Sequence, residues 1–276
     1  MKIEQWLARR ISPETKFGEG LRRIYRHMSS RVDRAWTEVF HALAASQEEV
    51  RFVQVGSNDS GYGDPLRFHI LNNGWRGLLI EPLPYVYERL QARCGDINGL
   101  ILENVAIDTE EGYRPFYHLR PSDEPDLPPW YDMLGSFLKE NVLRHQIYLS
   151  DIPDRLMSTP VRCITFDHLC VKHGFDQFDV LHIDAEGYDY EILRKVNLTR
   201  YQPTLVLFES KHLSDDDYAA SLRQLHEAGM LTHTDSMDTI AVAKTALQGH
   251  ASMAKAWKFL RSRTGMPVMS THAGTR

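Results

Sequence analysis

The patterning of the chain changes from helical to strand-like at residues 51–61, RFVQVGSNDSG. Residues 52–55 form a short apolar run rich in β-branched residues, and Gly56 ends it, which predicts a buried parallel strand followed by a tight turn. The loop is not G-x-G-x-x-G, because position 58 is Asn, and it lacks the Gly-Lys-Ser/Thr of a P-loop. Ligands of open α/β sheets bind at the carboxyl ends of strands, so this loop is a candidate site for a nucleotide-like ligand.

Strands and helices alternate on both sides of this loop. The pattern predicts strands at 77–80, 100–107, 180–183 and 205–208, and helices at 65–73, 84–93, 188–196 and 215–228. Residues 230–234 and 239–243 have the spacing of a hairpin. Such alternation builds a mostly parallel sheet covered by helices, so we expect an α/β protein whose sheet closes with an antiparallel hairpin.

Three parts are expected along the chain. Residues 1–48 form a helical N-terminal extension, 49–245 the α/β domain, and 246–276 a C-terminal helix with a flexible tail. Within the domain, an insertion at about 108–160 departs from the simple alternation.

The insertion contains a candidate strand at 113–119 and a candidate helix at 134–147. Four prolines between 121 and 129 exclude a helix or a central strand there. We expect a long loop that covers the acceptor side of the site, with Trp130 and Tyr131 available to stack on a sugar ring; a surface insertion without function is the alternative.

The composition is that of an ordinary globular protein, since 42% of the 276 residues are hydrophobic and 25% are charged. No apolar run predicts a membrane-spanning helix, and the first residues, MKIEQWLARRI, lack the apolar core of a secretory signal. Three cysteines at irregular spacing support neither a disulfide framework nor a four-cysteine zinc site. A reducing cytoplasm is the expected compartment.

The net charge of −5 is unevenly distributed, because residues 1–34 contain nine Lys/Arg and only four Asp/Glu. This basic segment could contact a membrane surface, nucleic acid or a phosphorylated substrate, or be a solvated helix face. No zinc finger or aromatic RNA-binding motif is present, so nucleic acid is not an expected partner. The sequence does not predict an oligomeric state.

Acidic residues follow two of the predicted strands. Glu81 ends the second strand, 25 residues after Gly56, where a carboxylate can accept hydrogen bonds from both hydroxyls of a ribose. Asp184 ends the strand at 180–183 and shares a face with His182, and Glu186 follows. An acid-lined pocket that grips a ribose suits S-adenosylmethionine, a ribose-containing cofactor without phosphate. Ordinary strand-end acids, and for Glu186 a helix N-terminal acid, are the alternatives.

Proton transfer or metal binding could occur at the end of the next strand. His212 lies in the loop after Glu209, and a histidine near its usual pKa of about 6.5 is a common general base. We expect His212 first, and Asp184 second, to deprotonate an acceptor hydroxyl. The carboxylates of Asp184, Glu186 and Glu209 could instead hold Mg²⁺, although separate strand-end acids are also routine without a metal.

These motifs together resemble the FkbM family of S-adenosylmethionine-dependent methyltransferases. The resemblance rests on the ordered set VQVGSNDSGYGDPL, GLLIEPLPYVYERL, ENVAID, TFDHL, FDVLHIDAEGYDYEIL and LVLFESKHL, and covers roughly residues 50–245. It implies a Rossmann-like class I methyltransferase fold with seven strands, the last antiparallel, and O-methylation of sugars, glycolipids or natural products. Ser60 departs from the family pattern, which often has Gly there.

The same resemblance implies roles for individual residues. It assigns Gly56, Ser57 and Asn58 to the methionine end of the cofactor, Glu81 to the ribose, Asn104 and Ala106 to the adenine, and Asp184 and Glu186 to the transferring methyl. Asp184 could also bind the ammonium group of the cofactor. A nicotinamide-dependent sugar dehydrogenase or epimerase, and a cofactor-binding scaffold without turnover, are the alternative functions.

Overall fold

The computed structural model describes residues 36–61, 63–122, 124, 126–128 and 130–262. Its main sheet has seven strands in the order β10-β11-β9-β8-β1-β2-β3. Strands β3, β2, β1, β8 and β9 are parallel, and β11 runs antiparallel to both β9 and β10. The strands are β1 (Arg51–Val55), β2 (Arg76–Ile80), β3 (Leu100–Glu103), β8 (Val180–Ile183), β9 (Leu205–Glu209), β10 (Met230–Thr234) and β11 (Asp238–Ala243). The predicted α/β fold class and its closing hairpin are confirmed.

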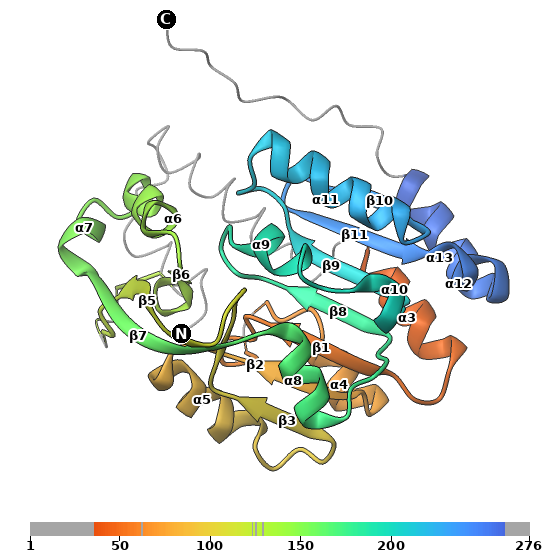
Figure 1. Ribbon diagram of the computed structural model, residues 1–276, viewed down its shortest axis with the longest axis horizontal. Helices are drawn as coiled ribbons and strands as arrows, with labels where there is room; N and C mark the ends of the chain where they lie inside the picture. The colour runs from red at the N-terminus through yellow and green to blue at the C-terminus, as the bar shows by residue number, and fades with distance from the viewer. Residues whose placement is uncertain (1–35, 62, 123, 125, 129, 263–276) are drawn as a thin grey trace, which may run out of the picture.

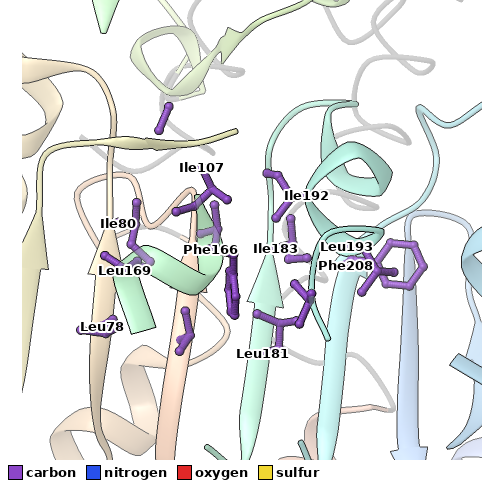
Figure 2. Packing of buried hydrophobic residues seen from close by; sticks show 14 of the residues in the cluster. Leu78, Ile80, Ile107, Phe166, Leu169, Leu181, Ile183, Ile192, Leu193 and Phe208 are labelled. Carbon is purple, nitrogen blue, oxygen red and sulfur yellow. The ribbon is translucent and has the colours of Figure 1, made fainter. Parts of the chain in front are cut away.

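Helices cover both faces of the main sheet because its strand residues alternate between two apolar clusters. The first face packs on α8 (Phe166–His173), α9 (Asp189–Leu193), α10 (Leu198–Tyr201) and α11 (Asp215–Glu227). The second packs on α3 (Thr37–Ser46), α4 (Arg67–Asn73) and α13 (Ala251–Ser262), while α5 (Pro84–Cys94) contributes to both. In β2, for example, Leu78 and Ile80 face one cluster and Leu79 the other. Figure 2 shows Leu78 and Ile80 beside Phe166 and Leu169 of α8.

A second sheet is inserted between β3 and β8, with strand order β4-β7-β5-β6. It comprises β4 (Ala106–Ile107), β5 (Gly112–Leu119), β6 (Gly135–Ser136) and β7 (Leu156–Ile164). In Figure 1 this sheet lies to the left, with α6 (Lys139–Leu143) and α7 (Ile152–Arg155), away from β10 and β11. The strand predicted at 113–119 is confirmed as part of β5.

Three sequence-based boundaries in this region are wrong. The strand predicted at 100–107 is broken at Asn104 and Val105, so that β3 joins the main sheet and β4 the inserted one. The helix predicted at 134–147 starts instead as β6, because Gly135 and Ser136 pair with β5, and continues as α6 and the 3₁₀ turn η3 (Arg144–Ile147). The helix predicted at 188–196 is the shorter α9. Neither β7 nor α8 was predicted.

The flanking segments are described only in part. Helix α3 lies within the expected N-terminal extension, and the remaining expected helices, at 1–35, lie outside the described residues. After β11 the chain forms α12 (Lys244–Gly249) and α13, and the expected tail at 263–276 also lies outside them. Among the described helices, none combines the length and apolar character needed to cross a membrane.

Candidate active site

A cavity of about 750 Å³, including its open mouth, lies at the carboxyl ends of β1, β2 and β8. The inserted sheet forms its opposite wall through Phe116, Gly135 and Phe137. Six of the residues singled out from the sequence line it, namely Gly56, Asn58, Glu81, Ala106, Asp184 and Glu186. Ser57, Asn104 and His212 are close in sequence or space to these residues but are not part of the lining.

The loop after β1 is shaped by the close approach of the loop after β8. Gly56 has a φ of 76°, and a Cβ atom there would lie 1.9 Å from the carbonyl oxygen of Asp184. The backbone N–H groups of Gly56 and Ser57 both donate to the carbonyl of Ile80 over 3.0 Å. Glycine is therefore required at position 56, for its backbone conformation and for space.

Ser60, the departure from the family pattern, fits into this loop without entering the cavity. Its φ is 49°, so a non-glycine residue occupies the left-handed region. Its hydroxyl donates to Asp64 over 2.5 Å, and its carbonyl accepts from Arg67 over 2.6 Å. The added side chain is thus used to hold the loop against the start of α4.

Glu81 is the buried acid at the end of β2, with 5% of its surface exposed. Its Oε1 accepts from the N–H of Leu83 over 3.0 Å, and its Oε2 accepts from the N–H of Asn58 over 3.1 Å. Burial, opposed by these hydrogen bonds and reinforced by the charge of Asp59, raises the pKa of Glu81 to about 7. The carboxylate therefore changes charge within the physiological pH range.

Asn104 supports this acid from behind. Its side-chain N–H donates to the carbonyls of Glu81 and Pro82, over 2.8 and 3.1 Å. The side-chain amide is thus bonded to the backbone of the loop after β2, and its place near the adenine stays a prediction. The apolar wall near this loop comes from Leu83, Ala106 and Ile107.

The loop after β8 carries Asp184 and Glu186 into the cavity. Glu186 has a φ of 48°, one of four positive values among the described non-glycine residues; two others, at Asn58 and Ser60, belong to the loop after β1. Asp189, which is fully buried, accepts from the N–H groups of Ala185 and Gly187 over 3.2 and 3.0 Å. Burial and the nearby carboxylates of Glu209 and Asp184 raise its pKa well above the usual range.

His212 lies beside Glu186 and Glu209 rather than in the cavity lining. Its Nε2 is 3.7 Å from Glu186 Oε2 and 3.8 Å from Glu209 Oε2. Burial, together with the positive charges of Lys211 and Arg144, lowers the pKa of His212 to about 3. The expectation that His212 titrates near 6.5 is therefore wrong, and the ring is neutral at pH 7.

Arg144 also determines which ring nitrogen of His212 carries the proton. The guanidinium Nη1 lies 3.0 Å from His212 Nδ1. Because a guanidinium can only donate, Nδ1 is the acceptor, and the proton of the neutral ring is on Nε2, the atom that faces the two carboxylates.

Two groups of side chains have the spacing of metal ligands. They are Asp184, Glu186 and Glu209, and His145, Glu186 and His212, with the ligand atoms of each group within 4.8 Å of one another. Positive charge is already present at both, because Lys211 Nζ is 2.7 Å from Glu209 Oε1 and Arg144 contacts His212. His182, which was predicted to share a strand face with Asp184, borders a second hollow of about 280 Å³ that Glu209 and Asp238 also line.

No sequence pattern indicated the residues through which the inserted sheet contacts the loop after β8. Ser136 and Asn141 both donate to the carbonyl of Glu186, over 3.1 and 2.7 Å. Tyr188 donates to Asp108 over 2.9 Å and accepts from Arg114 over 3.2 Å. These pairs are separated by 45 to 80 residues, so no local pattern could reveal them.

Comparison with known proteins identifies one family. The family model described as methyltransferase FkbM domain matches residues 54–231, which is more than half of the chain. The matched segment includes the loop after β1, the buried acid Glu81 and the loop after β8, which line the cavity. No curated protein matches the sequence.

Solved structures of methyltransferases show only distant similarity. Methyltransferase FkbM from Methylobacillus flagellatus is 15% identical with a TM-score of 0.43, over 71% of this chain and 44% of that one. A precorrin-6y C5,15-methyltransferase from Geobacter metallireducens is 12% identical with a TM-score of 0.36, over 73% and 86%. A fibrillarin pre-rRNA processing protein from Methanococcus jannaschii is 10% identical with a TM-score of 0.36, over 72% and 68%.

The present chain thus spans less than half the length of the Methylobacillus protein, and the family assignment rests on the domain match. That match covers the strand ends where the loop with Gly56, the buried Glu81 and the carboxylates of Asp184 and Glu186 meet. This chain belongs to the methyltransferase FkbM family.

Proposed function

We propose that this chain is an S-adenosylmethionine-dependent methyltransferase that acts on a hydroxyl group of a sugar, glycolipid or natural-product acceptor. The observation that carries the proposal is the pair of carboxylates, Asp184 and Glu186, that lines the cavity where the loop after β8 enters it. An aliphatic hydroxyl must lose its proton as it attacks the methyl group, and a positioned carboxylate can accept that proton. An amine acceptor attacks with a lone pair and has no such need at the moment of transfer.

The residues of the cavity fit S-adenosylmethionine. The ionised carboxylate of Glu81 has remaining lone pairs for the two ribose hydroxyls. Gly56 allows the loops after β1 and β8 to approach each other at the cavity, and the buried hydroxyl of Ser57, next to the lining, has no hydrogen-bond partner among the described residues. Bound in this cavity, the cofactor supplies a methyl group activated by a positively charged sulfur.

We assign proton removal to the Asp184–Glu186 pair rather than to His212. Both carboxylates line the cavity, whereas neutral His212 directs its Nε2 proton towards Glu186 and Glu209. In this tautomer Arg144 occupies Nδ1 and Nε2 already carries the proton, so neither ring nitrogen is open to accept a proton. His212 then stabilises the negative charge of the carboxylates, and the enzyme contributes mainly by aligning the acceptor oxygen with the methyl group.

A row of aromatic rings leads from the surface to this pair and suits a ring-shaped acceptor. Tyr148, 40% exposed, lies 6.2 Å from His145 between ring centroids, and His145 lies 6.2 Å from His212. Trp130 lies 5.6 Å from His145. Flat aromatic faces pack well against the apolar face of a sugar or polyketide ring. Tyr131, also expected to stack, is buried and donates to the carbonyl of Arg120 over 2.8 Å.

The same arrangement supports a mechanism without Mg²⁺. Lys211 and Arg144 already place positive charge beside Glu209 and His212, the residues that complete the two metal-like groups. A divalent cation there would be repelled by both side chains. Activity that survives EDTA supports this part of the proposal, whereas activity lost with EDTA and restored by Mg²⁺ contradicts it.

The test is methyl transfer to a panel of glycosides, glycolipids and polyketide-type alcohols, followed by release of S-adenosylhomocysteine and by the mass of the acceptor. Asp184→Asn and Glu186→Gln should each lower kcat, by about 10²–10⁴-fold for the residue that takes the proton. Glu191→Gln is the matched control, because Glu191 is an exposed acid of α9 that pairs with Arg194 outside the cavity. Methylation of amines but not of hydroxyls would overturn the proposal.

We further propose a small-molecule or glycan acceptor, rather than nucleic acid, and a cytoplasmic location. The acidic character of the cavity wall disfavours a polyphosphate chain. The three free cysteines are typical of a reducing compartment. The basic residues at 1–34, for which peripheral membrane contact was one of the alternatives, lie outside the described part of the chain.

A further inference from the structure

The carbonyl of Glu186 is held by two side chains of the inserted sheet and its following helix. Asn141, the third residue of α6, donates from Nδ2 over 2.7 Å, and Ser136 of β6 donates from Oγ over 3.1 Å. Asn141 and Ser136 are both buried, so these bonds are made away from solvent. A hydrogen bond to a buried carbonyl is costly to remove, because the carbonyl is then left unsatisfied.

The backbone that these bonds hold is strained. Glu186 occupies the left-handed region with a φ of 48°, and the following Gly187 has a φ of 90°. A Cβ atom at position 187 would lie 2.2 Å from Asn141 Nδ2, so the asparagine packs directly on the loop. A non-glycine residue keeps such a conformation only where its surroundings determine it.

The conformation matters because it determines where the Glu186 carboxylate lies. That carboxylate lines the cavity and lies within 4.8 Å of ligand atoms of Asp184 and Glu209. Glu209 is paired with Lys211, whereas the carboxylates of Asp184 and Glu186 line the cavity and favour a positive charge there. The family resemblance assigns these two residues to the transferring methyl, so the positive charge expected beside them is that of the sulfur bearing the methyl group.

We infer that Asn141, assisted by Ser136, is a positioning residue that holds Glu186 so that its carboxylate favours the positively charged methyl-bearing centre of the cofactor. The inserted sheet therefore sets the charge around the transferring group as well as forming a wall of the cavity. The inference rests on the methyltransferase activity of the family and is independent of which acceptor is methylated.

We call the hydrogen bonds from Asn141 and Ser136 to the Glu186 carbonyl a clamp, and the chain contains a matched control for it. Asn104 makes the same kind of contact, from one side-chain amide to the backbone carbonyls of Glu81 and Pro82, at the ribose side of the cavity. A clamp at the ribose should affect every adenosine ligand equally. A clamp at the methyl end should affect only ligands that carry positive charge there.

The experiment compares two ligands by calorimetry and needs no acceptor. Sinefungin carries an ammonium group where S-adenosylmethionine carries its methyl, and S-adenosylhomocysteine carries no charge at that point. Asn141→Leu, which is close in size, removes the N–H donor and adds no charge, should lower the preference for sinefungin by about tenfold, the value of one charge-assisted contact. Affinity for S-adenosylhomocysteine should stay within about twofold of the wild type.

Four further variants complete the design. Glu186→Gln should lose the same preference, and the double variant Asn141→Leu/Glu186→Gln should lose no more than Glu186→Gln alone, because both changes remove one effect. Asn104→Leu should weaken both ligands and leave their ratio unchanged. If Asn141→Leu does not fold, Ser136→Ala should show a smaller loss of the same preference.

A wild-type ratio in Asn141→Leu, or an equal loss for both ligands, overturns the inference, as does an unchanged ratio in Glu186→Gln. Failure to methylate any hydroxyl would contradict the proposed acceptor class and would leave these ratios as expected. The two failures are therefore distinguishable.

Discussion

Replacement of Glu81 by glutamine isolates the contribution of the buried acid to cofactor binding. In the wild type, each carboxylate oxygen accepts one backbone N–H, at 3.0 and 3.1 Å. The glutamine side chain places its own N–H group against one of those backbone donors. Its single oxygen can accept hydrogen bonds from fewer ribose hydroxyls. Loss of a hydrogen bond to a charged group costs about 1.5–3 kcal/mol, so S-adenosylhomocysteine should bind about 10- to 150-fold more weakly.

The effect should depend on pH because burial raises the pKa of Glu81 to about 7. The ribose hydroxyls donate to the ionised carboxylate, so wild-type affinity should be constant well above pH 7 and fall by about tenfold per pH unit below it. The glutamine variant should show no such slope. In the absence of ligand the sign is opposite: the raised pKa makes the folded wild type lose stability as the pH rises from 4.5 to about 7, on the order of 3 kcal/mol.

Calorimetry with S-adenosylhomocysteine at pH 5.5, 7.0 and 8.5 measures both the loss of affinity in the glutamine variant and the pH dependence of the wild-type affinity. Glu103→Gln is the matched control, because Glu103 ends the adjacent strand β3 but pairs with Lys172 and His173 outside the cavity lining. Its affinity should equal that of the wild type. A glutamine variant at position 81 that binds within twofold of the wild type at pH 8.5 would refute the assignment of Glu81 to the ribose.

Two other substitutions and one thiol-labelling experiment test the packing of the protein. Gly56→Ala should abolish S-adenosylhomocysteine binding in calorimetry and lower Tm, because its Cβ would overlap the carbonyl of Asp184; normal binding would contradict the close approach of the two loops. Tyr188→Phe should lower the free energy of unfolding in urea by about 1–3 kcal/mol, because buried Asp108 loses a donor; an unchanged midpoint and slope would show that the bond contributes nothing. Cys94, Cys163 and Cys170 are each 1% exposed, and burial raises the pKa of the latter two to about 11 and about 12, so Ellman's reagent should react only after unfolding.

The parts of the structure that the sequence predicted well are determined by neighbouring residues. The strands that end before Gly56, Glu81 and Asp184 are short, largely apolar runs of four or five residues, which can be recognised in the sequence. Because the ends of parallel strands meet at one edge, the chemistry of the cavity could be assembled from these short patterns.

The parts that were missed depend on residues distant in sequence. In β7 the buried residues are confined to the end of the strand, at Val161, Cys163 and Ile164, so its nine residues show no continuous apolar run. Gly135 and Ser136 form a strand only because β5 pairs with them. The amphipathic pattern of residues 134–147 could not distinguish this short strand from the start of a longer helix.

The behaviour of two site residues was equally beyond local patterns. The amide of Asn104 is occupied by carbonyls more than twenty residues earlier, which a family motif does not reveal. The pKa of His212 depends on burial, on Lys211 beside it and on Arg144, 68 residues away. Its position in sequence indicated a titrating base, and only the folded environment shows a neutral ring.

The place of β1 in the main sheet has a consequence for synthesis of the chain. β1 lies between β2, which follows it closely, and β8, whose Ile183 pairs with Val55. Ribosomes add about 5–20 residues each second, so one edge of β1 waits for roughly ten seconds until β8 has been made. During that interval an apolar strand with an open edge is exposed to other chains. Co-translational protection by chaperones should therefore matter more for this protein than its compact final sheet suggests.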